Sequence, residues 1–247
     1  MPTMMNTNLD EIADGIFQIS TFMPYVGERG FTINQFLIRA DEPLLFHLGP
    51  RRLFENMTEF AGRVTKLSRI RFLAFSHVEA DECGALPQWL KVVRRDAEVV
   101  MGDVAANWTA SELTDAPVTA LRNGYLLELG DKRVRWKATP HVLHGWDAGM
   151  LLEETTNTLM CADVFTQLGE RPPMTDSADI VEWALEAEDV MHSTAITPSL
   201  PATLLELAEM RPDTLAVMHG ASFNGDCRDA LHALSEAYLH RLENSMP

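Results

Sequence analysis

The chain of 247 residues contains little cysteine and few basic residues, and each shortage excludes a class of protein. Its three Cys, at positions 83, 161 and 227, show no CxxC spacing. A disulfide framework, a zinc ribbon and an iron–sulfur site are therefore not expected. The chain has 20 Lys and Arg against 36 Asp and Glu, which gives a formal net charge of −16. Because nucleic acids and anionic membranes select basic surfaces, we expect neither as a partner.

Long apolar runs and a recognisable targeting segment are lacking as well. No uninterrupted apolar run approaches the roughly 20 residues that a helix needs to span a bilayer. The opening MPTMMNTNLDEIADG has neither the basic nor the apolar region of a secretory signal. We therefore expect a cytoplasmic protein. With 46% hydrophobic residues, the chain is predicted to form a single domain, residues 1–247, with one sizeable core.

Short apolar runs separated by turn-like segments predict strands in both halves of the chain, with helices after each half. The predicted strands are 16–20, 31–38, 44–48, 71–76, 125–129, 134–138, 150–153, 159–162 and 214–218. The predicted helices are 86–94, 181–191, 202–209 and 226–242. This order favours an α/β (α+β) protein whose sheets are covered by helices on their outer faces. Residues 77–85 are predicted to be a loop, and loops after buried strands commonly carry function.

That loop begins with His77-Val-Glu79-Ala-Asp81-Glu82. If it is extended, residues 77, 79 and 81 point the same way, so that one imidazole and two carboxylates converge. Such groups would repel one another or stay solvated unless a cation held them. The pattern therefore predicts a metal site.

Three later segments offer further metal ligands, each just after an apolar strand. They are His144 in the segment 139–147, Asp163 after 159–162, and His219 after 215–218. Together the candidates comprise three His and four carboxylates, enough for two metals with one bridging carboxylate. The four negative charges would balance two divalent ions. Mixed imidazole and carboxylate donors suit iron or manganese, and zinc also accepts them.

His-x-Glu-x-Asp, then His, Asp and His, each after a strand, resembles the metallo-β-lactamase superfamily. The usual motif of that superfamily is His-x-His-x-Asp-His. Glu79 in place of the second His is the mark of one branch, the diiron domain of flavodiiron proteins, which reduce oxygen and nitric oxide. The intervals from Asp81 to His144 and from His144 to Asp163 match that branch, and the interval to His219 is slightly short. The segment Leu143-His-Gly-Trp-Asp147 is similar to the Leu-His-Trp-Pro-Asp of the branch.

The resemblance implies an αββα sandwich of two mixed sheets covered by helices. It implies one iron held by His77, Glu79 and His144. It implies a second iron held by Asp81, Glu82 and His219. Asp163 and an oxo or hydroxo group would bridge the two irons, and manganese or zinc are the alternative metals.

Flavodiiron reductases carry a flavodoxin domain after the diiron domain, and this chain has no Gly-rich phosphate loop and no room for FMN. We therefore expect a stand-alone protein that binds dioxygen or nitric oxide. It would sense the gas, or reduce it with an external electron donor. A signalling protein and a second copy in a homodimer are the other expected partners.

Several alternatives stay open at this stage. Glu82 stands where the family usually has His, so it is either a ligand or an acid that hydrogen-bonds to a ligand. His141 could replace His144 as a ligand, or lie behind the ligands or in the pocket. His47 stands where the superfamily often has Asp, and it is expected, with His192, to lie behind or beside the ligands. The competing function is a metal-dependent hydrolase, in which a metal-bound hydroxide attacks an ester, thioester or lactone; Glu79 distinguishes the two functions.

Overall fold

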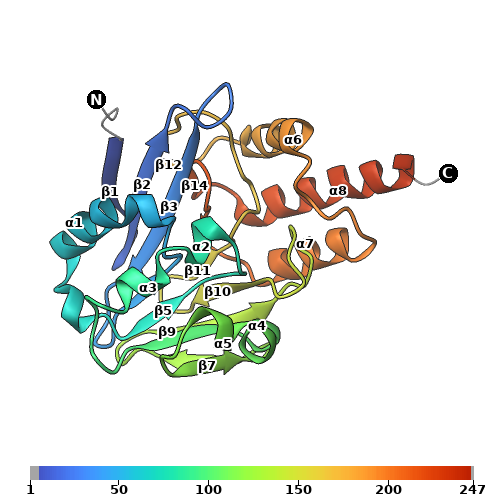
Figure 1. Cartoon of the computed structure of the whole chain (residues 1–247). Helices are drawn as coiled ribbons and strands as arrows, with labels where there is room; N and C mark the ends of the chain where they lie inside the picture. Colours follow the sequence, from blue (N-terminus) through green and yellow to red (C-terminus); the bar gives the residue numbers. More distant parts are fainter. Residues whose placement is uncertain (1–5, 246–247) are drawn as a thin grey trace.

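The computed structural model describes residues 6–245 and shows two β-sheets packed face to face, with helices on both outer sides (Figure 1). This arrangement confirms the predicted αββα sandwich with two mixed sheets. Within the described residues, none of the helices combines the length and apolar character that crossing a bilayer requires.

The first sheet has seven strands in chain order, and its second half is parallel. β1 to β4 pair antiparallel, whereas β4 to β7 pair parallel. The strands are β1 (Asn6–Ala13), β2 (Ile16–Met23), β3 (Phe31–Ile38), β4 (Leu44–Phe46), β5 (Phe72–Ala74), β6 (Glu98–Gly102) and β7 (Val118–Leu121). β3 is buried along its whole length, as expected for a strand covered on both faces.

The second sheet comes from the second half of the chain and is ordered β12-β14-β13-β11-β10-β9-β8. Its strands are β8 (Leu126–Glu128), β9 (Arg133–Ala138), β10 (Gly149–Glu153), β11 (Thr158–Met160), β12 (Met174–Thr175), β13 (Thr214–Ala216) and β14 (Ser222–Phe223). The pairs β11·β13 and β12·β14 are parallel, and the others are antiparallel. The parallel pair β11·β13 brings two loops, after Met160 and after Ala216, to the same edge.

Helices of the first half cover the first sheet, and helices of the second half cover the second sheet (Figure 1). The first set is α1 (Phe54–Val64), α2 (Ala80–Cys83), α3 (Leu86–Trp89), α4 (Asp103–Trp108) and α5 (Ala110–Leu113), with short 3-10 turns at Arg51–Leu53 and Leu67–Arg69. The second set is α6 (Ile180–Met191), α7 (Ser199–Glu209) and α8 (Cys227–Ser245).

The hydrophobic side chains form three layers that match this architecture. One lies between the first sheet and its helices and includes Leu37, Met57 and Trp89. A second lies between the two sheets and includes Phe36 and Trp136. The third lies between the second sheet and α6 to α8. Successive strand residues supply two layers because their side chains alternate between faces.

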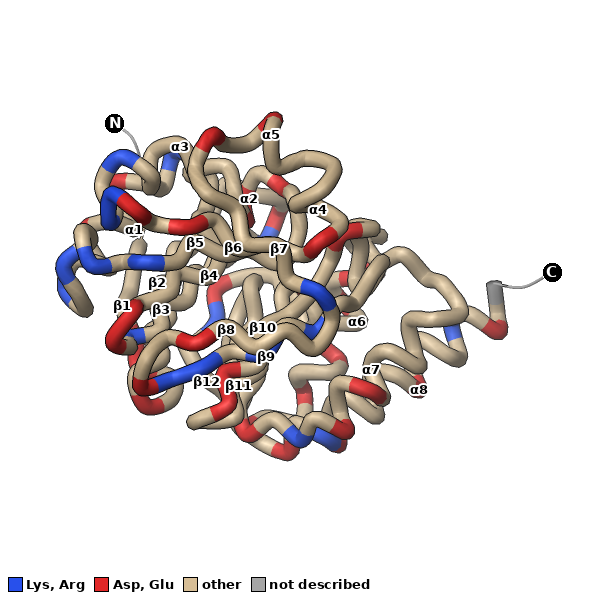
Figure 2. The backbone as a smooth tube through the Cα atoms, turned by 90° about the horizontal axis from the view of Figure 1, so that it is seen from below, with Lys and Arg blue, Asp and Glu red and all other residues tan. Residues whose placement is uncertain are grey.

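The acidic residues are spread along most of the tube, and Lys and Arg lie in several separate places, one of them around α1 (Figure 2). Many surface carboxylates are paired, as in Arg63–Glu59 on α1 and Arg94–Glu42. Exposed pairs of this kind contribute little to stability.

Candidate metal centre

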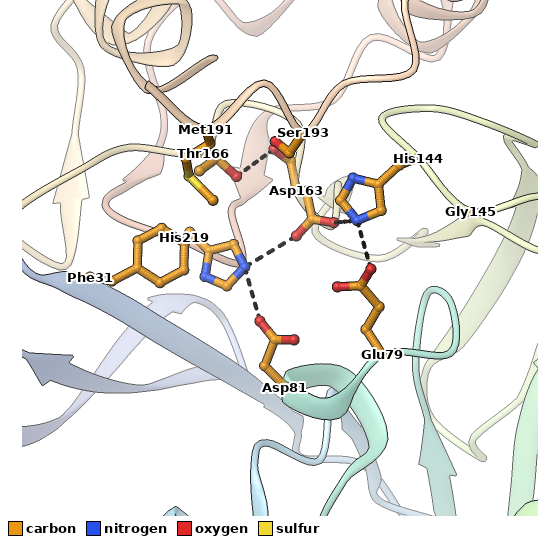
Figure 3. A pocket seen from close by; sticks show the side chains of 10 residues that line it. All are labelled: Phe31, Glu79, Asp81, His144, Gly145, Asp163, Thr166, Met191, Ser193 and His219. Carbon is orange, nitrogen blue, oxygen red and sulfur yellow. Dashed lines mark hydrogen bonds and ion pairs between the residues drawn. The ribbon is translucent and has the colours of Figure 1, made fainter. Parts of the chain in front are cut away.

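The seven candidate ligands lie together where loops from both sheets meet. Figure 3 shows five of them, Glu79, Asp81, His144, Asp163 and His219. Residues 77–82 follow β5 of the first sheet, whereas the other three residues follow strands of the second sheet. These are His144 after β9, Asp163 after β11 and His219 after β13. Three groups of side chains could each hold a metal ion. They are His77, His144 and Asp163; His77, Glu79 and Glu82; and Asp81, Glu82 and His219. Within each group the ligand atoms lie within 4.8 Å of one another.

The local geometry of the first segment differs from the extended loop that we expected. The chain is extended at Glu79 and then enters the short helix α2 at Ala80. In an extended chain, Asp81 and Glu82 would point to opposite sides, whereas consecutive residues of a helical turn are only about 100° apart. The helical turn therefore lets both carboxylates face the same site.

Asp163 lies between the two halves of the cluster, with one carboxylate oxygen toward each half. Its Oδ2 is 3.5 Å from His77 Nε2 and 3.4 Å from His144 Nε2. Its Oδ1 is 3.2 Å from His219 Nε2. A carboxylate in this position can bridge two cations that lie on either side of it.

Glu82 is 1% exposed and belongs to two of the three groups, so its carboxylate also faces both halves of the cluster. Burial raises the pKa of Glu82 well above its usual range, and the charges of Asp163 and Asp81 raise it further. Without a cation, this carboxyl would take up a proton rather than stay charged.

Hydrogen bonds behind two imidazoles aim their Nε2 atoms into the site. His219 Nδ1 lies 2.9 Å from the carbonyl oxygen of Thr32, which can only accept, so Nδ1 carries the proton. The lone pair of His219 is therefore on the inward Nε2. His77 Nδ1 lies 2.8 Å from Ser76 Oγ.

Gly145 lets the imidazole of His144 lie close to that of His77. It has a φ of 77°, and a Cβ there would be 3.3 Å from His77 Cβ. A larger residue would be strained in this conformation and would crowd the ligand loop. His77 and His144 consequently pack edge to face, with ring centroids 4.8 Å apart.

The charges of the site shift the pKa values of its histidines and carboxylates. Contact with Glu79, whose Oε1 lies 3.5 Å from His144 Nε2, raises the pKa of His144 to about 9. Burial raises the pKa of Asp163, but contact with His219 and the neighbouring imidazoles outweigh burial and hold it below its usual range.

Buried atoms without hydrogen-bond partners converge on the centre of the site. They are His77 Nε2, His144 Nε2, Asp163 Oδ1 and Glu82 Oε2. Buried polar atoms are normally hydrogen-bonded, so a set of lone pairs aimed at one place fits a bound cation. All donors are imidazole or carboxylate. Cys83 does not add a thiolate, because burial raises its pKa to about 11 and its Sγ–H is bonded to the Glu79 carbonyl oxygen. The residues present therefore fit a two-metal site.

The other predicted histidines lie outside the three groups. His141 is exposed, and its backbone N–H donates to Gly145 O. The structure therefore brings His144, and not His141, to the cluster. His192 is exposed and ends α6. His47 is fully buried, and its Nε2 lies 3.0 Å from Ser76 Oγ.

A cavity of about 430 Å³ opens onto the cluster (Figure 3). Besides candidate ligands it is lined by Phe31, Gly145, Thr166, Met191 and Ser193. Phe31 packs on the His219 ring, with centroids 4.2 Å apart. The sequence analysis did not identify these lining residues, because they come from separate segments that carry no shared motif.

Asp147 is a further residue whose role the sequence did not reveal. It is buried, and its Oδ2 accepts the backbone N–H of Val78 at 3.1 Å. This bond joins the segment that carries His144 to the segment that carries His77 and Glu79. The only sequence signal was its place in the Leu143–Asp147 motif.

A family model described as ODP family beta lactamase matches residues 31–220. No curated protein matches the chain by sequence. Among solved structures, rubredoxin oxygen:oxidoreductase from Desulfovibrio gigas matches with a TM-score of 0.81 and 20% identity, over 96% of this chain and 62% of that chain. The flavodiiron protein from Giardia intestinalis matches with a TM-score of 0.81 and 16% identity, over 96% of this chain and 60% of that chain.

A fragment, residues 1–254, of a Nostoc protein described as a diflavin flavoprotein also matches. Its TM-score is 0.81 at 16% identity, and the match covers 98% of this chain and 97% of the fragment. The chain thus spans about three-fifths of the length of the two larger proteins. At these identities the likeness establishes a shared fold.

Proposed function

The chain belongs to the family described as ODP family beta lactamase, and from that membership we propose that it is a non-haem diiron protein that binds dioxygen. It would serve as an oxygen sensor, or reduce oxygen or nitric oxide with electrons from a separate donor. The observation that carries the proposal is the donor set, in which Glu79 and three further carboxylates join three imidazoles around two adjacent positions.

The proposed ligands of one iron are His77, Glu79 and His144. Those of the other iron are Asp81, Glu82 and His219. Asp163 would bridge the two, which its separate contacts of Oδ1 and Oδ2 support. The buried, otherwise protonated state of Glu82 supports its assignment as a ligand, because a cation would relieve the repulsion among the carboxylates.

The carboxylate content supports iron over the zinc of a hydrolase. Four carboxylates neutralise two divalent ions and favour the higher charge of the ferric state. When bound, two iron ions would supply the redox chemistry for dioxygen or nitric oxide.

The chain's own residues would set the conditions of that chemistry. Thr32 O holds the proton of His219 on Nδ1, so Nε2 is free to act as a ligand. Phe31 and Met191 line the cavity with apolar surface beside the cluster. Thr166 and Ser193 provide hydroxyl groups at the mouth. Residues 1–247 would act as one domain that receives electrons from outside.

Metal analysis and optical spectroscopy test this proposal. Protein produced with sufficient iron should hold about two irons per chain, and the spectrum of the anaerobically reduced protein should change on exposure to air. Asp163→Asn is a useful comparison, because it keeps the shape of the bridging residue and should lower the iron content. Zinc alone under iron-replete conditions, together with hydrolysis of an ester, thioester or lactone, would contradict the proposal.

Electron supply needs a separate measurement. The purified chain should not oxidise NADH on its own, and oxygen consumption should require an added donor such as a rubredoxin or a flavoprotein reductase. Sustained NADH oxidation by the pure chain would show that it needs no separate donor.

A further inference from the structure

Behind His77 lie two buried polar side chains, Ser76 and His47, that no ligand assignment uses. His77 Nδ1 is 2.8 Å from Ser76 Oγ, and Ser76 Oγ is 3.0 Å from His47 Nε2. All three side chains are nearly inaccessible to solvent. The parallel pairing of β4 with β5, in which Phe46 lies beside Ala74, brings His47 next to Ser76, and the backbone N–H of His47 donates to Ala74 O.

The direction of these hydrogen bonds follows from the inward atom of His77. If His77 Nε2 binds a metal, the proton of the neutral imidazole is on Nδ1, which donates to Ser76 Oγ. The hydroxyl of Ser76 has one proton, and with His77 Nδ1 donating, His47 Nε2 is the acceptor left for it among the contacts of Ser76 Oγ in the described residues, so we assign the proton to that hydrogen bond. His47 therefore accepts at Nε2 and carries its own proton on Nδ1.

His47, the last residue in this series of hydrogen bonds, is neutral. Burial lowers the pKa of His47 to about 3, so the ring does not carry a positive charge at neutral pH. Its Nδ1 has no hydrogen-bond partner within the described part of the chain. A carboxylate in the same place would accept the Ser76 proton without burying a donor.

We propose that His47 is a positioning residue that acts through Ser76 to hold His77 in the tautomer with Nε2 free, and that it keeps the chain behind this ligand electrically neutral. The inference rests on the proposed metal site. Carboxylate partners behind metal-bound histidines raise the basicity of the ligand. A neutral imidazole does not, so His77 is a weaker donor here than it would be with Asp at position 47.

Asn and Asp at position 47 provide a matched pair of variants. Both are similar in size and tolerate the positive φ of 62° found at His47, and they differ in charge. Zinc is the probe, because its binding requires neither oxygen nor electrons. His47→Asn should bind Zn²⁺ within about threefold of wild type. His47→Asp should bind it roughly tenfold more tightly, the lower end of the usual range for partners of metal ligands.

The same pair in a Ser76→Ala background separates the hydrogen-bond path from direct attraction between charges. Without the hydroxyl, the affinity ratio of the Asp and Asn variants should fall from about tenfold to less than about threefold. An unchanged ratio would show that the charge acts through space, and would overturn the role of Ser76. Equal affinities in both backgrounds would overturn the proposed influence of position 47.

Nitrogen NMR of ¹⁵N-histidine-labelled, zinc-loaded protein tests the tautomers directly. His77 and His47 should each carry a proton on Nδ1, and His47 Nε2 should be unprotonated. A proton on His47 Nε2, or a doubly protonated His47, would overturn the inference while leaving the metal site intact. Failure of the wild-type protein to bind metal would refute the proposed function and the inference with it. Zinc binding without iron binding would refute only the proposed diiron function.

Discussion

Replacing Glu82 with Gln should stabilise the metal-free protein, and bound metal should reduce or abolish that gain. Burial and the charges of Asp163 and Asp81 raise the pKa of Glu82 in the metal-free protein far above its ordinary value of 4.5. Below that ordinary value the carboxyl is protonated in both the folded and the unfolded chain, so it has no effect. As pH rises toward the folded-state pKa, only the unfolded chain releases the proton, and the folded state loses stability.

The Gln side chain does not ionise, so without metal the Gln variant should be more stable than wild type at neutral and alkaline pH. The difference should shrink toward pH 4. A fully uncompensated buried charge costs about 3–5 kcal/mol, and protonation limits that cost, so we expect about 1–3 kcal/mol. For a chain of this length, each kcal/mol shifts Tm by about 2–4 °C. The metal-free variant should therefore melt roughly 2–12 °C higher than wild type.

With metal bound, the charge of Glu82 faces cations, so the gain in stability of the Gln variant should shrink or disappear. Loss of a residue that supports a metal typically lowers affinity about 10–100-fold, which is about 1.4–2.7 kcal/mol. Calorimetry in EDTA and in excess metal, between pH 5 and pH 9, measures both effects. A decrease in Tm of equal size in both states would refute the reasoning, because it would mean that Glu82 acts only through packing.

Glu79→Gln is the matched control for this experiment. Glu79 is 51% exposed, and contact with His144 lowers its pKa. A carboxyl with a lowered pKa stabilises the fold above its unfolded-state pKa. The Glu79 variant should therefore lose stability in EDTA at neutral pH, in contrast to the Glu82 variant.

Three further predictions follow from other contacts in the structure. Because contact with Glu79 raises the pKa of His144 to about 9, metal must displace a proton, so affinity should rise between pH 6 and pH 9 in titration calorimetry; an affinity independent of pH would contradict this. Gly149→Ala should cost about 1–3 kcal/mol in chemical unfolding, because the new Cβ would lie 2.0 Å from Trp136 Cζ2; an unchanged midpoint would show that Trp136 can move aside. Asp147→Ala should release the ligand segment and accelerate loss of metal to a chelator, and an unaltered release rate would exclude that role.

The sequence allowed the candidate ligands to be located because their segments follow apolar strands, and strand ends are recognisable locally. It did not reveal the helical turn at Ala80–Cys83, because the segment is short and charged. β1 was missed because NTNLDEIA has few apolar residues, and its pairing with β2 stabilises it. α1 was also missed, since only Met57 and Ala61 are buried along it.

Two other differences arise from contacts between distant residues. The helix predicted at 86–94 ends at Trp89, after which backbone hydrogen bonds mix three- and four-residue spacings before the chain turns toward β6. The approach of His47 to Ser76 depends on the register of β4 against β5, which no local pattern specifies. Sequence reasoning therefore identified residues that act next to one another in the chain more readily than those joined by sheet pairing.

The division of the ligands between the two sheets has a consequence for the order of events during synthesis. The first sheet contributes only the segment 77–82, and the second sheet contributes residues 144, 163 and 219. A nascent chain on the ribosome would hold an incomplete set of the proposed ligands until residue 219 has emerged and the two sheets have docked. Metal would thus be acquired after folding rather than nucleating it. Metal selectivity would then depend on the geometry of the folded site. It would not depend on the affinity of individual side chains in the unfolded chain.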